Sequence, residues 1–135
     1  MELPKFISDY EDILQNIEAV IIYLHRDFPL VDYDVMEGLE ALISYYKQID
    51  QGREANIPKL SDRAIKVFVE VRYICEWRMG KESSALGMAK VPAGSRICSL
   101  AEIITCLKRI LKSVKLWNKS HGRFGYLNFV GQYIK

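Results

Sequence analysis

Apolar side chains recur every three or four residues along most of the chain, the spacing that places them on one face of an α-helix. The segment from 7 to 26 is the clearest case, because its apolar positions also repeat about every seven residues, as in helices packed side by side. Similar periods predict helices over residues 34–51, 62–79 and 99–120, and a short one over 126–134. The pattern predicts an all-α fold: a single four-helix-bundle-like domain with a short fifth, C-terminal helix.

Residues that commonly begin or end helices support these boundaries. Ser61 precedes the third predicted helix, and Ser99 with Glu102 has the spacing of a capping box at the fourth. Gly80 and Gly122 follow the third and fourth helices, where glycine readily takes the left-handed conformation that ends a helix. The sequence therefore contains a start signal and a stop signal for both the third and the fourth predicted helix.

Three local features are less clear. Asp32 and Asp34 are both candidates to cap the second helix. Residues 67–71 alternate in a way that also fits a strand, although the length of the surrounding run favours a helix. Residues 81–98 are rich in serine and glycine, contain a proline and show no period, which predicts a mobile loop.

Composition limits the class of protein. Half of the residues are hydrophobic and 27% are charged, the balance of a folded domain. No stretch approaches the ~18 apolar residues of a membrane span, and the first residues lack the pattern of a signal peptide. The three cysteines show no C-x-x-C spacing, which is typical of free thiols in a reducing compartment. We expect a cytoplasmic protein that does not enter a membrane.

Charge is unevenly divided along the chain. Residues 1–60 contain 12 acidic and 5 basic side chains, a net charge of −7, whereas residues 61–135 contain 5 acidic and 14 basic ones, a net charge of +9. Helical geometry gathers part of the basic excess on one face of the fourth helix and just beyond it: Lys108, Arg109, Lys112, Lys115, Lys119 and Arg123.

Two interpretations of these cations stay open. They could neutralise the phosphates of a nucleic acid, with Trp117, Phe124 or Tyr126 adding base stacking. They could equally form an ordinary solvated face that complements the helix dipole and lies beside the acidic first and second helices. No nucleic-acid recognition motif accompanies the cations, so the sequence favours the second interpretation.

The third helix carries a second apolar stripe, formed by Val69, Tyr73 and Trp77, opposite its main apolar face. A helix that is apolar on two sides is either central in the fold or covered by another chain. Together with Phe129 and Tyr133 this stripe predicts an interface, most simply that of a homodimer. The alternative is that the fifth helix or the 81–98 loop covers it.

No spacing in the sequence indicates catalysis, a cofactor or a metal site. The histidines and cysteines do not recur at ligand spacings. His121 follows Ser120 directly, but neighbours in sequence do not form a catalytic pair. We therefore expect a non-enzymatic protein without cofactor that acts through protein contacts, and the alternative is a nucleic-acid-associated module that uses the cations of the fourth helix.

Overall fold

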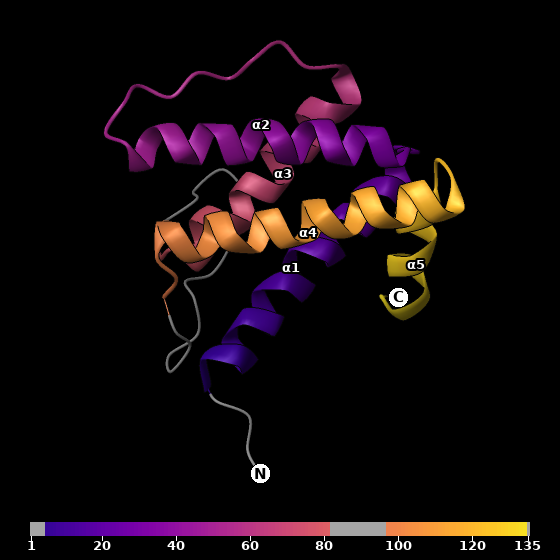
Figure 1. Ribbon diagram of the computed structural model, residues 1–135, viewed down its shortest axis with the longest axis horizontal. Coiled ribbons are helices and arrows are strands. Elements are labelled where there is room, and N and C mark those ends of the chain that lie inside the picture. Colours follow the sequence, from indigo (N-terminus) through magenta and orange to yellow (C-terminus); the bar gives the residue numbers. More distant parts are fainter. Residues whose placement is uncertain (1–4, 82–96, 135) are drawn as a thin grey trace.

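The computed structural model describes residues 5–81 and 97–134, with side chains from residue 12 onward. It contains five helices (Figure 1): α1 (Lys5–Asp27), α2 (Asp32–Asp50), α3 (Asp62–Arg78), α4 (Leu100–His121) and α5 (Gly125–Tyr133). No strand occurs in these residues, so the predicted all-α fold is confirmed, and residues 67–71 are helical. The helix ends fall within two residues of the predicted ones. Most of the predicted 81–98 loop lies outside the described residues.

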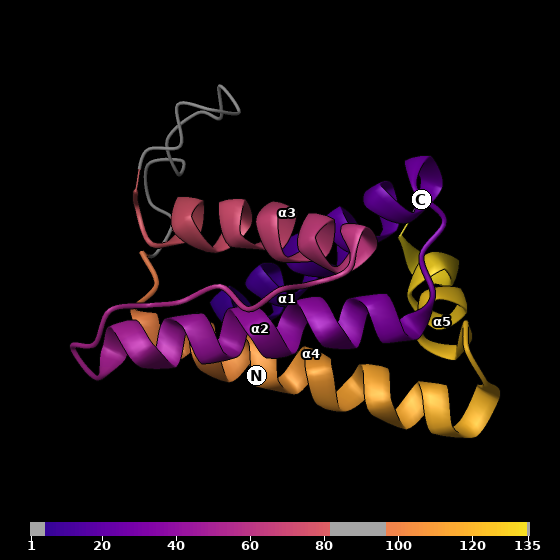
Figure 2. The ribbon, with the colours of Figure 1, turned by 90° about the horizontal axis from the view of Figure 1, so that it is seen from above.

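Helices α2 and α3 run in the same direction. Near their first turns Gly38 lies against Ala64 and Val67, and near their ends the Tyr46 hydroxyl donates to Glu76 Oε1 at 3.2 Å. Residues 51–61 therefore return along the length of the pair as an extended chain (Figure 2). Eleven extended residues can reach ~36 Å, more than the ~25 Å of a 17-residue helix, so the connection is long enough.

Two other pairs of neighbouring helices, α1 with α3 and α2 with α4, are antiparallel. Arg78, at the end of α3, donates to Asp12 Oδ2 near the start of α1 at 2.7 Å. Asn118, near the end of α4, donates to Asp32 at the start of α2 at 3.3 Å. In Figure 1, α1 lies at a steep angle to α2 and α4, so the arrangement departs from a regular up-and-down bundle.

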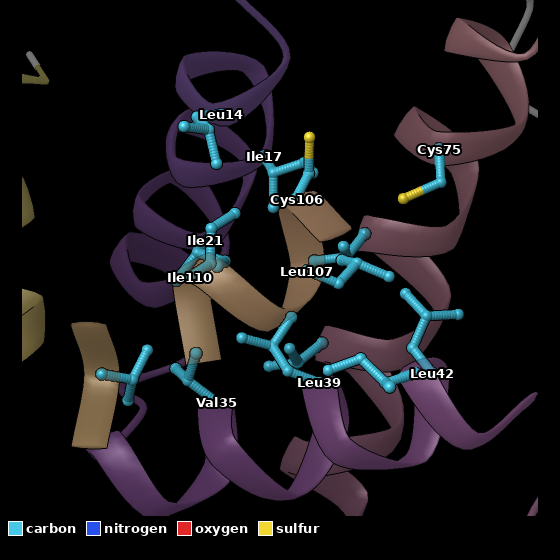
Figure 3. Packing of buried hydrophobic residues seen from close by; sticks show 14 of the residues in the cluster. Leu14, Ile17, Ile21, Val35, Leu39, Leu42, Cys75, Cys106, Leu107 and Ile110 are labelled. Atoms are coloured by element: carbon cyan, nitrogen blue, oxygen red, sulfur yellow. The ribbon is translucent and has the colours of Figure 1, made fainter. Parts of the chain in front are cut away.

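The core lies where α1, α2, α3 and α4 meet. Apolar side chains from all four helices converge there (Figure 3), among them Ile17, Leu39, Cys75 and Leu107. All three cysteines are buried and none of them is in a disulfide, as expected for thiols that pack as small apolar residues. Burial raises the pKa of the Cys75 thiol well above its ordinary value, so this thiol is neutral at physiological pH.

A buried carboxylate joins α5 to the rest of the fold. Asp32 accepts hydrogen bonds from the amides of Tyr126 at 3.0 Å and Leu127 at 3.3 Å, in the first turn of α5. Of the two candidate caps of α2, Asp32 is therefore not the one that caps its own helix, because its carboxylate caps α5. Asp34 is the residue that caps the start of α2, because its side chain accepts a hydrogen bond from the amide of Val31 at 2.8 Å.

Candidate nucleic-acid interface

The orientation of helix α4 is set by the cap at its first turn and by the apolar face that it buries. The Ser99 hydroxyl accepts from the Glu102 amide at 3.2 Å, which confirms Ser99 as the cap, and the same hydroxyl donates to Glu102 Oε1 at 3.1 Å. Its buried side chains lie along one face and enter the core: Ile103, Ile104, Cys106, Leu107, Ile110 and Val114. The opposite face must then be turned to solvent.

That outward face, together with the turn after α4, carries a set of cations that we call the basic row: Lys108, Arg109, Lys112, Lys115, Lys119 and Arg123. All six side chains are exposed. No acidic residue occurs anywhere from position 103 to the end of the chain, so α4 itself offers them no partner beyond its first turn.

Acidic α2 touches the basic row at Lys115. The Lys115 ammonium lies 3.2 Å from Glu40 Oε1, with both side chains more than half exposed, and such a pair contributes at most about 1 kcal/mol. Within the described part of the chain, Lys108, Lys112 and Lys119 form no ion pair. The row thus faces mainly solvent and not the acidic helices.

The aromatic residues near the row differ sharply in exposure. Trp117 is stacked on Phe129, with ring centroids 4.0 Å apart, and on His121 at 4.7 Å. Tyr126 is fully buried, and its hydroxyl donates to Glu18 at 3.4 Å. Burial also raises its pKa well above the usual value. These positions do not offer an open ring for a base, whereas Phe124 is 38% exposed.

The five residues predicted to form an interface are divided between two places. Val69 and Tyr73 line a shallow groove between α2 and α3, together with Tyr45 and Ile49 of α2. Trp77 lies half-buried further along α3.

The remaining two belong to α5 and have partners within the chain. Phe129 is stacked on Trp117, and the Tyr133 hydroxyl donates to Glu18 Oε2 at 2.7 Å. The five side chains are therefore not brought together as one continuous surface. The homodimer stays a prediction.

The described residues contain no cluster of three or more histidine, cysteine or acidic side chains that could hold a metal ion. None of their helices combines the length and the apolar character needed to cross a membrane. Comparison with protein-family models, curated protein sequences and solved structures returns no match. A proposal for the function therefore rests on the residues of the chain itself.

Proposed function

We propose that this protein is a nucleic-acid-associated module that binds phosphate groups through the basic row of α4. The observation that carries the proposal is the exposure of Lys108, Lys112 and Lys119 without an ion pair to any described residue. Cations that only balanced the acidic helices would lie against them. A row turned to solvent instead retains its full attraction for an external polyanion.

The shape of the row favours nucleic acid over an anionic membrane. A helix that lies on a membrane needs an exposed apolar face beside its cations. The apolar face of α4 is buried in the core, and Leu116 is the large apolar side chain that the helix leaves well exposed. From Lys108 to Lys119 the row extends ~17 Å along one direction, which suits a linear chain of phosphates.

Charge reversal within the row tests the proposal. Binding of labelled nucleic acid is measured by fluorescence anisotropy at ~50 mM salt and repeated at rising salt. Lys108→Glu combined with Lys112→Glu should weaken binding by at least tenfold. It should also lower the slope of log affinity against log salt by about 1.5 to 2, since two phosphate contacts are lost.

A matched control separates the row from net charge. Lys59→Glu with Arg63→Glu makes the same change in net charge at two exposed positions, before α3 and in its first turn. This pair should leave binding nearly unchanged. Equal weakening by both pairs, or no binding by the native protein at low salt, would contradict the proposal.

A further inference from the structure

The basic row ends at an exposed aromatic ring. After α4 the chain turns at Gly122, whose φ is +83°, and places Arg123 and Phe124 one after the other. The Arg123 guanidinium lies 5.3 Å from the centroid of the Phe124 ring. A positive charge and an open ring are thus paired directly beyond the last lysine of the row.

Neither capping nor core packing accounts for Phe124. It occupies the N-cap of α5, where serine, threonine, asparagine or aspartate would be stabilising, and its side chain makes no cap hydrogen bond. Asp32 supplies the acceptors for the first α5 amides in its place. The ring is also not enclosed by the core, unlike Tyr126 two residues later.

A second exposed ring belongs to the backbone segment that adjoins Arg123. Tyr33, in the first turn of α2, is 67% exposed. Its neighbour Asp32 donates its backbone amide to the carbonyl oxygen of Arg123 at 2.8 Å, so the two backbone segments adjoin. Aromatic rings beside a cationic track are the features by which proteins hold unpaired bases.

We propose that the ligand is a single-stranded nucleic acid, with its phosphates along the basic row and a base stacked at the Phe124–Tyr33 end. This inference rests on the proposed function of the row. In a duplex the bases are already stacked on one another and only their edges are accessible in the grooves, so a duplex would use the lysines alone.

The experiment compares a single strand with its duplex of equal length. The single strand should bind more tightly, and Phe124→Leu should weaken it by at least about fivefold while leaving the duplex unaffected. Phe124→Trp, which retains a stacking surface, should restore the affinity. A strand carrying 2-aminopurine should lose fluorescence on binding, and this quenching should be absent with Phe124→Leu.

Phe28→Leu is the matched control for the loss of an exposed ring. Phe28 is 40% exposed and also lies under a cation, with the Lys66 ammonium 4.2 Å from its ring centroid, but it is at the end of α1 and not on the row. Thermal unfolding of both leucine variants checks that they are folded.

The outcomes separate the two proposals. Equal affinity for single strand and duplex, or equal weakening by the Phe28 and Phe124 variants, would overturn the single-strand inference. If the Lys108–Lys112 pair still weakened binding, the proposed function would stand. Absence of binding to either form would overturn both.

Discussion

Asp32 shows how much of this fold depends on one buried carboxylate. It is fully buried, yet three donors from the C-terminal part of the chain converge on its two oxygens: the amides of Tyr126 and Leu127 and the side chain of Asn118. The negative charge also lies at the N-terminus of α5, where the helix dipole favours it. A single side chain thus joins α2, α4 and α5.

Replacing Asp32 should reveal this dependence. Asp32→Ala leaves buried donors without an acceptor and is expected to lower the free energy of unfolding by about 2 to 4 kcal/mol. Asp34→Ala, which removes a partly exposed cap of α2, should cost about 1 kcal/mol. Urea denaturation followed by circular dichroism measures both. Equal costs for the two variants would contradict the central role of Asp32.

His25 predicts a pH dependence of stability. Its Nδ1 accepts from the Leu30 amide at 2.9 Å, which requires that nitrogen to be unprotonated. Burial lowers the pKa of His25 below its ordinary value near 6.5, although Asp32 partly opposes the shift. As pH falls through 6.5, the unfolded chain takes up a proton before the folded one does, so the free energy of unfolding should decrease.

The measurement is urea denaturation between pH 7.5 and the region near 5.5. His25→Asn keeps a side-chain acceptor but does not titrate, and it should flatten the pH dependence in this window. His121→Asn, a change at an exposed position, should leave that dependence largely in place. If the His121 variant and not the His25 variant flattened the curve, the assignment to His25 would be wrong.

At the scale of elements, the unexpected arrangement is the parallel pair α2 and α3. Their close approach depends on Gly38, which is buried on α2. A Cβ at that position would lie 2.8 Å from the carbonyl oxygen of Ala64 and 2.8 Å from Val67. Both contacts are shorter than real Cβ atoms allow, so a side chain here would force the two helices apart.

Gly38→Ala tests this contact. On an isolated helix the change would stabilise by about 1 kcal/mol, but steric overlap should reverse the sign and destabilise the protein by roughly 1 to 3 kcal/mol. Gly131→Ala is the control, because Gly131 is exposed on α5 and the nearest atom to an added Cβ is 4.0 Å away. That change should be neutral or stabilising. A gain in melting temperature from both variants would contradict the close packing.

The helices themselves could be predicted because their signals are local. Ser61 accepts from the Ala64 amide three residues later, and Ser99 bonds Glu102 in the same way. Such short-range pairs, together with the apolar period, are visible in any window of the sequence. Parallel packing of α2 and α3 was not visible, since it depends on Gly38 meeting a residue on another helix.

At the scale of the whole molecule, the separation of acidic residues in the first half of the chain from basic residues in the second half has two consequences. One is internal to the fold: α2 and α4 are antiparallel neighbours, and Glu40 lies within 3.2 Å of Lys115. The other is external, because most of the basic row is turned to solvent. The asymmetry seen in the sequence is therefore only partly compensated by contacts between helices, and the uncompensated part is the candidate site.

The sequence by itself determined which segments are helical, where they begin and end to within two residues, and which face of α4 is basic, because these follow from local period and capping. Only the tertiary structure decided which neighbours each face meets. It divided the predicted interface between the α2–α3 groove and α5. It also stacked Trp117 on Phe129 and buried Tyr126, while Phe124 stayed exposed. It also gave Asp32 partners more than 90 residues away. Such contacts depend on how separate elements pack, which local periodicity cannot encode.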